Sequence, residues 1–189
     1  MKIAALQTVS TPDVDRNLEA AAGLIAQAAQ QGAQLVSLPE YFCLMGQRDT
    51  DKLDHAEAPG AGPIQSFLSE QAKQHGLWLI GGTLPLRAGT PERARNACCV
   101  YGPDGALAAR YDKIHLFRFE TERESYDEAR VLEAGSAPVA FTDGDTAWAR
   151  DERTDKSLVE AIRTGSAMVI KGTSNRGTTT TDTYSLSGT

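Results

Sequence analysis

The chain has 189 residues, of which 41% are hydrophobic and 23% charged, values typical of a folded globular protein of one domain or slightly more. Nineteen Lys and Arg residues against 25 Asp and Glu give a formal net charge of −6, which argues against binding nucleic acid or an anionic membrane surface. Three cysteines are too few for a disulfide framework, and no metal-ligand motif is present, so we expect no metal and no cofactor.

The first 84 residues alternate between predicted strands and predicted helices. Apolar runs predict three buried strands, at residues 3–9, 34–38 and 77–80. One amphipathic helix is expected between Asp13 and Gly32, and a second between Pro63 and Gly76, because apolar residues recur there at helical spacing. This β-α-β-α-β order predicts an α/β protein with a parallel sheet and helices packed on it.

The following segment has a different pattern. Residues 95–101 and 106–111 predict two strands joined by the turn sequence Gly102-Pro103-Asp104-Gly105, which is typical of a hairpin. A long loop without regular structure, rich in Glu and Arg, is expected over residues 114–135, and a short strand over 138–142.

The composition shifts near residue 143, where we place a domain boundary. Residues 145–157 are polar and charged, and Leu158, Val159 and Ile162 predict a short helix. Residues 167–170 and the run TTTTDTY predict strands within a tail dense in Thr, Ser and Gly. The N-terminal apolar run is too short for a signal peptide, and no run is long enough to span a bilayer, so we expect a cytoplasmic protein without a membrane partner.

Glu40 and Lys113 are the first candidates for catalysis. Glu40 directly follows the second predicted strand, where reactive groups of α/β sheets collect, and we consider it a candidate general base. Lys113 follows the second hairpin strand among apolar residues, where an ammonium group can stabilise a developing oxyanion. From position alone, a solvated loop glutamate and a surface lysine beside Asp112 are the alternative interpretations.

Other chemically active side chains carry weaker signals. Glu124 is one of five carboxylates within residues 120–128, so composition alone does not distinguish it from a solvated loop residue. His115 has no identifiable catalytic partner. Cys98 and Cys99 are expected to be buried, inert thiols of one strand, and Cys43 is expected to pack in the interior although it lies close to Glu40.

Taken together, these segments resemble the nitrilase superfamily of carbon–nitrogen hydrolases, in particular the amidases related to omega-amidase and deaminated glutathione amidase. The motifs LPEYF and YDKIHLF carry the resemblance, with GLWLIGGTLP and the GPDG hairpin between them. It covers residues 1 to about 142. The family implies an α-β-β-α sandwich, of which this chain would hold the N-terminal half only, with a short α+β tail appended.

The resemblance also implies roles for individual residues. Glu40 matches the family's general base, Lys113 the lysine that stabilises the tetrahedral intermediate, and Glu124 the additional loop glutamate that helps position substrate and water. The family's nucleophilic cysteine has no counterpart, because no cysteine follows Cys99. The three cysteines present fall at non-catalytic positions of the family pattern.

The tail has a resemblance of its own. Residues 156–189, and above all the run GTSNRGTTTTDTYSL, are similar to the C-terminal part of the invasion-associated locus B family of exported proteins. We therefore interpret the chain as a partial hydrolase domain at 1–143, a junction at 144–155 and a tail fragment at 156–189. A fusion, a frame error and a rearranged gene are all compatible with this arrangement.

Three functions follow from these observations. The first is an amidase for small linear amides, of the Glu-Lys-Cys type, expected to be inactive as it stands because the nucleophile is absent. The second is a non-catalytic chimeric or truncated protein with a binding or interaction role, expected to self-associate because half a sandwich exposes an apolar sheet face. The third, an exported interaction module defined by the tail, is disfavoured by the expected lack of a signal peptide.

Overall fold

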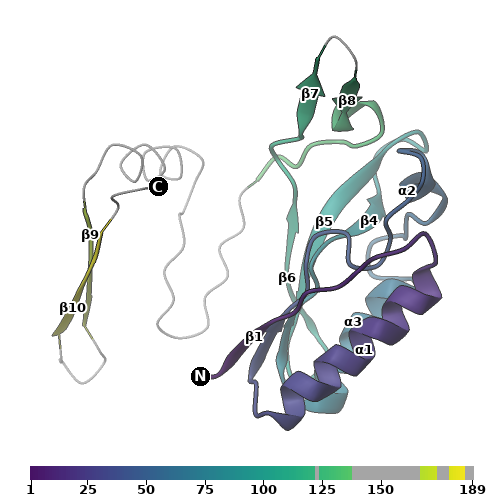
Figure 1. The fold of residues 1–189 in the computed structure, drawn as a ribbon. Helices are drawn as coiled ribbons and strands as arrows, with labels where there is room; N and C mark the ends of the chain where they lie inside the picture. The colour runs from purple at the N-terminus through teal and green to yellow at the C-terminus, as the bar shows by residue number, and fades with distance from the viewer. Residues whose placement is uncertain (122–123, 138–166, 174–178, 186–189) are drawn as a thin grey trace. The chain divides into compact units, whose positions relative to one another are not determined.

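The computed structural model describes residues 1–121, 124–137, 167–173 and 179–185 (Figure 1). The chain divides into two compact units, Met1–Ser136 and Ala137–Thr189, and each is considered by itself. The first unit is built on a mixed sheet of six strands. Its strands are β1 (Ile3–Ala5), β2 (Leu35–Ser37), β3 (Trp78–Ile80), β4 (Leu84–Arg87), β5 (Ala94–Tyr101) and β6 (Leu107–Asp112).

The sheet combines a parallel and an antiparallel part. Strands β1, β2 and β3 are parallel neighbours in that order. Strands β3 and β4 pair antiparallel with successive parts of β5, and β6 pairs antiparallel with the other side of β5. The predicted β-α-β-α-β unit and the predicted hairpin are therefore confirmed, and the chain is of the α/β class.

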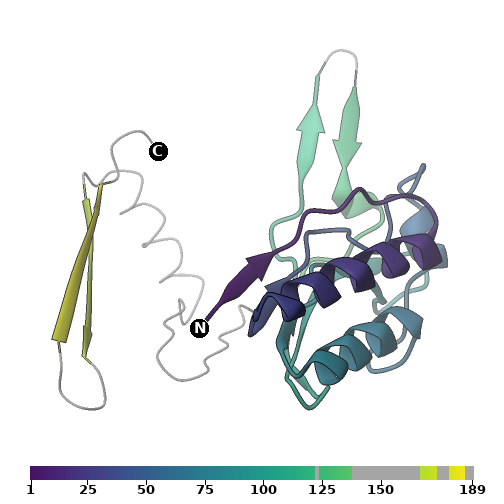
Figure 2. The same ribbon diagram turned by 60° about the horizontal axis from the view of Figure 1, so that its bottom comes forward.

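Two helices, α1 (Val14–Gln30) and α3 (Pro63–His75), lie side by side on one face of this sheet (Figures 1 and 2). Helix α1 begins where predicted, because the Asp13 side chain accepts a hydrogen bond from the backbone N–H of Arg16. Helix α3 ends at Gly76, whose φ of 60° is the left-handed conformation that favours glycine.

The two faces of the sheet are buried to different extents. Residues on the face toward the helices are fully buried, including Val36 and Leu79, and they pack with Ile25 of α1 and Leu68 of α3. Because strand residues alternate between faces, their neighbours point to the opposite face. Along β2, β3 and the second half of β5, the side chains on that face are only partly buried: Leu35, Ser37, Trp78, Ile80, Cys98 and Val100.

The sequence analysis missed two elements and was wrong about a third segment. Strand β4, which contains Pro85, was not predicted, and the structure places it at the end of the sheet order. A short helix, α2 (Asp51–Asp54), interrupts the polar stretch after β2. The segment predicted to be a loop contains a two-stranded sheet of β7 (Arg118–Glu120) and β8 (Ser125–Asp127), followed by the 3-10 turn η1 (Glu128–Arg130).

In the second unit, β9 (Ala167–Thr173) pairs antiparallel with β10 (Thr179–Ser185), which confirms the two strands predicted in the tail. The predicted strand at 138–142 and the predicted helix near 158–162 lie outside the described residues. Among the helices that the structure describes, none has the length and apolar character needed to cross a membrane.

Candidate active site

Glu40 is the third residue beyond the carboxyl end of β2, which is Ser37. After β2, one more hydrogen bond joins the chain to β3, from the N–H of Leu38 to the carbonyl of Ile80, and the chain then turns at Pro39. The Glu40 side chain is half exposed, and its Oε1 accepts hydrogen bonds from Asn96 Nδ2 at 2.7 Å and Lys113 Nζ at 3.1 Å. The structure therefore brings together the two residues that the sequence singled out.

Lys113 directly follows β6, where its own N–H donates to the carbonyl of Asn96 on β5. Its ammonium group lies between two carboxylates. One is Glu40, and the other is Glu128, whose two oxygens lie 3.0 and 3.2 Å from Nζ. Three segments distant in sequence thus meet at one point, which we call the polar corner (Glu40, Lys113 and Glu128).

Glu128 is the buried member of the polar corner. Only 4% of its side chain is exposed, and Oε2 accepts a hydrogen bond of 2.7 Å from the N–H of Phe117. A buried carboxylate requires such partners, because an unpaired charge in the interior is costly. Glu128 therefore fixes Lys113 from the protein side, while Glu40 faces solvent with half of its side chain.

The surroundings of Lys113 favour the protonated form of its side chain. Burial by itself lowers the pKa of this ammonium group, but the hydrogen bonds and charges of Glu128 and Glu40 outweigh burial and raise the pKa above its ordinary value. Lys113 therefore stays protonated at neutral pH. A fixed cation of this kind is suited to stabilising an oxyanion that develops during attack on an amide carbonyl.

The structure does not bring Glu124 to this site. Glu124 is exposed, and its N–H and carbonyl form hydrogen bonds with Thr121 beside the β7–β8 pair. The second carboxylate in contact with Lys113 is Glu128, and the role in positioning substrate and water that the resemblance implies for Glu124 stays a prediction. Sequence reasoning missed Glu128 because several carboxylates are close together there; the signal that marks Glu128 is the apolar pair Val131-Leu132 that follows, which anchors its turn in a small buried cluster.

Three further residues at the polar corner were not predicted. Asn96, 2% exposed, donates to Glu40, and its Oδ1 has no hydrogen-bond partner among the described residues. The Tyr41 hydroxyl donates a hydrogen bond of 3.4 Å to Glu128. Burial, and after it the charge of Glu128, raises the pKa of Tyr41, so the hydroxyl stays protonated. Lys52 of α2 lies 3.4 Å from that hydroxyl and 5.0 Å from the centre of the Tyr41 ring.

The cysteines are separate from the polar corner. Cys43 and Cys99 are fully buried in the helix-covered core, and Cys98 is partly buried on the opposite face. Burial raises the pKa of Cys43 and of Cys99 to about 12 and that of Cys98 to about 11. All three are thus protonated at neutral pH, as expected for packing residues, and none is paired in a disulfide.

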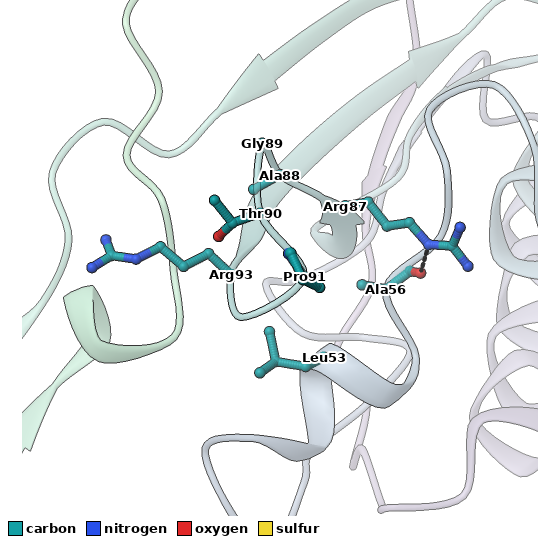
Figure 3. A pocket seen from close by; sticks show the side chains of 8 residues that line it. All are labelled: Leu53, Ala56, Arg87, Ala88, Gly89, Thr90, Pro91 and Arg93. Carbon is teal, nitrogen blue, oxygen red and sulfur yellow. Dashed lines mark hydrogen bonds between the residues drawn. The ribbon is translucent and has the colours of Figure 1, made fainter.

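A cavity of about 430 Å³ lies elsewhere, between α2 and the loop from β4 to β5 (Figure 3). Arg87 and Arg93 flank it, but their guanidinium groups point in opposite directions, and Arg87 Nε donates to the carbonyl of Ala56 (Figure 3). Two cations that do not converge make a poor anion site. The convergent titratable groups are at the polar corner, and we place the candidate active site there.

Comparison with known proteins gives matches over most of the chain. The family model described as carbon-nitrogen hydrolase matches residues 2–179, and so extends past residue 142, where the sequence resemblance ended. A chloroplastic omega-amidase of Arabidopsis thaliana is 38% identical over 133 residues, which are 68% of this chain and 36% of that protein. A deaminated glutathione amidase of Synechocystis is 37% identical over 144 residues, 74% of this chain and 52% of that enzyme.

Solved structures show the same fold. An amidase from Nesterenkonia sp. superposes with a TM-score of 0.61 at 28% identity, over 75% of this chain and 51% of its own. A variant of that amidase superposes with a TM-score of 0.62 at 27% identity, over 77% of this chain and 54% of its own. That variant carries acrylamide added to its active site cysteine. This chain therefore spans about half the length, or less, of the relatives it matches.

Proposed function

The chain belongs to the carbon-nitrogen hydrolase family, and on that premise we propose that its first unit holds the base and the cation of an amidase site for small linear amides. The observation that carries this proposal is the contact of Lys113 with both Glu40 and Glu128. Among the described residues, these three groups converge as an amide hydrolase requires.

In the proposed mechanism, Glu40 is the general base, because it is the half-exposed carboxylate and is accessible to a thiol or a water. Lys113 stabilises the oxyanion of the tetrahedral intermediate. Glu128 keeps the Lys113 ammonium in place, and Asn96 orients the Glu40 carboxylate. In a relative that holds the nucleophilic cysteine, the thiolate attacks the amide carbon, ammonia or an amine leaves with the proton taken from the thiol, and water then hydrolyses the thioester.

We propose that these 189 residues hydrolyse amides slowly or not at all. The family's nucleophile lies in a segment with no matching cysteine, and the three thiols present are protonated packing residues. Without a nucleophile most of the rate is lost, although the base and the cation remain. The purified chain should therefore release no ammonia from a panel of small ω-amides, and neither should its Glu40→Gln variant.

Ammonia release by the purified chain would change this proposal in one of two ways. Release by the chain that is lost in Glu40→Gln would mean that another group replaces the missing thiol, and Cys98, the one partly exposed cysteine, would be substituted first. Release that is equal in both proteins would contradict the role of Glu40 as the general base. Circular dichroism of both proteins would show that the comparison is between folded chains.

A second candidate is a non-catalytic protein with a binding or interaction role. It is favoured by the partly buried apolar side chains on the sheet face opposite α1 and α3, which promote self-association. Light scattering of the purified chain should then show oligomers, whereas a monomer across a range of concentrations would count against this candidate. A cytoplasmic location is also a proposal, which the three unpaired thiols support.

The origin of residues 144–189 is a further part of the proposal. Their resemblance to the invasion-associated locus B family supports a chimeric chain with a junction near residue 143, whereas the family match that continues to residue 179 supports a single domain. A transcript from the source organism that reads through the codons of 136–156 without a break would support a real gene. Two separate transcripts would support an artefact.

A further inference from the structure

The residue that follows Glu40 has an unusual backbone conformation. Tyr41 has a φ of 53°, and it is the one non-glycine residue with positive φ in the part of the chain that the structure describes. A bulky aromatic residue rarely adopts this left-handed conformation, and it persists only where the surroundings hold it. The turn at Tyr41 is therefore imposed by its neighbours.

The neighbours that impose this turn are the two residues before β4. Gly82 has a φ of 55°, and a Cβ at this position would collide with the carbonyl of Pro39, so the two backbones lie in contact. Next to it, the Thr83 hydroxyl accepts a hydrogen bond of 2.9 Å from the N–H of Tyr41. The segment that carries Glu40 is thus seated on Gly82 and Thr83.

The turn directs two adjacent side chains to opposite sides of Lys113. The Glu40 carboxylate reaches Lys113 Nζ at 3.1 Å, and the Tyr41 hydroxyl reaches Glu128, the other carboxylate on that ammonium. In an extended or helical conformation at residue 41, the same two side chains would leave in different directions. The left-handed turn therefore sets the geometry of the polar corner.

We propose that Thr83 is a positioning residue for Glu40: its hydroxyl holds the Tyr41 N–H, keeps the turn left-handed and so keeps the Glu40 carboxylate on Lys113. Thr83 acts through the backbone of Tyr41, and among the described residues it forms no hydrogen bond with Glu40, Lys113 or Glu128. The inference rests on the proposed function of Glu40 as a base. The test of this inference measures the Glu40–Lys113 contact and not the activity. A failure of the proposed function can therefore be distinguished from a failure of the positioning role.

The experiment observes the Lys113 ammonium by NMR of the full chain labelled with 15N-lysine, and the signal is assigned from its loss in Lys113→Met. Ammonium protons held by carboxylates exchange slowly with water. We expect Thr83→Val, which keeps the shape but removes the hydroxyl, to speed this exchange several-fold. Thr83→Ser keeps the hydroxyl and should behave like the unaltered chain. An unchanged exchange rate in folded Thr83→Val would overturn the proposal and assign the positioning of Glu40 to Asn96.

Two further variants separate positioning from general destabilisation. Ser69→Ala removes a side-chain hydrogen bond of 2.6 Å to the Gly105 carbonyl, away from the polar corner, and should leave the Lys113 exchange rate unchanged. Tyr41→Gly removes both the strained residue and the hydroxyl that bonds Glu128, so this single variant is the reference for the pair. Because glycine adopts positive φ without help, adding Thr83→Val to Tyr41→Gly should not speed the exchange further. If it does, the Thr83 hydroxyl does not act by holding the turn and the proposal is wrong.

Discussion

The helix-covered interior and the polar corner of the first unit hold different chemical groups. The interior holds Cys43 and Cys99, fully buried and with the pKa of each raised to about 12. The polar corner holds a half-exposed carboxylate, a fixed ammonium group and a buried carboxylate that anchors it. Thiols are present where nothing deprotonates them, and the base is present where no thiol reaches it.

This difference shows what each region is built for. The interior is optimised for packing, since its sulfur atoms fill space beside Phe42 and Leu84, and a thiol there is a small hydrophobic group. The polar corner is optimised for charge, since each charged group has an opposite partner within 3.2 Å. The two regions are therefore stabilised by different forces: the interior by apolar packing and the polar corner by ion pairs and hydrogen bonds.

The largest expected effect concerns thiol reactivity. With a pKa of about 12, Cys43 and Cys99 should be alkylated in the native chain at pH 8 about 10³-fold more slowly than in the unfolded chain, because little thiolate forms. Mass spectrometry of peptides after timed alkylation measures each site, with the chain in guanidinium chloride as the control. Rapid labelling of native Cys43 would show that the interior thiols are available for chemistry.

The next effect separates the two faces of the sheet. Leu79→Ala removes a fully buried side chain from the helix-covered face and should lower the free energy of unfolding by about 2–5 kcal/mol. Ile80→Ala, on the partly buried face, should cost about 1 kcal/mol, because less apolar surface returns to water. Urea denaturation measures both. Equal losses would mean that both faces are packed to the same extent in solution.

A third comparison sets the two loop carboxylates against each other. Glu128→Gln weakens the bonds to Lys113 and Phe117 in a buried position and should lower the free energy of unfolding by about 1–3 kcal/mol. Glu124→Gln, at an exposed position, should change it by less than about 0.5 kcal/mol. The same denaturation experiment tests the pair, and a larger loss for Glu124→Gln would reverse the assignment of the second carboxylate.

The smallest effect is the pH dependence contributed by Lys113. Its pKa is raised in the folded chain, since Glu128 and Glu40 outweigh burial, so the folded state holds this proton more tightly than the unfolded state. The stabilisation is complete below the unfolded pKa of about 10.4 and is lost as the pH rises through the folded pKa. The stability difference between the chain and Lys113→Met should thus be constant around neutral pH and shrink above about pH 10.4. A difference that grew with pH would have the wrong sign.

The parallel part of the fold was predictable because local signals and long-range packing agree there. Helix α1 has a capping Asp13, an apolar stripe and a glycine stop, and the GPDG turn fixes the hairpin of β5 and β6. Strand β4 was not predictable in the same way, since Pro85 opposes strand formation locally and pairing with β5 decides the outcome.

The candidate site was predictable only in part, for a physical reason. Lys113 directly follows β6 and Glu40 lies three residues after β2, so their positions follow from the sheet. Glu128 is selected by burial and by the Phe117 N–H, which no composition rule reveals among neighbouring carboxylates. The left-handed turn at Tyr41 depends on Thr83, a contact 42 residues away along the chain. Such tertiary contacts override local sequence signals.

The most direct test of the account supplies the half of a relative that this chain does not match. Residues 1–136 would be joined to the remaining part of the Synechocystis deaminated glutathione amidase, and ammonia release from small ω-amides would be measured. We predict release that falls at least about 10²-fold in Glu40→Gln and persists in Glu124→Gln. A folded graft that releases no ammonia, or that releases it equally well with Glu40→Gln, would contradict the assignment of the polar corner as the base and cation of an amidase site.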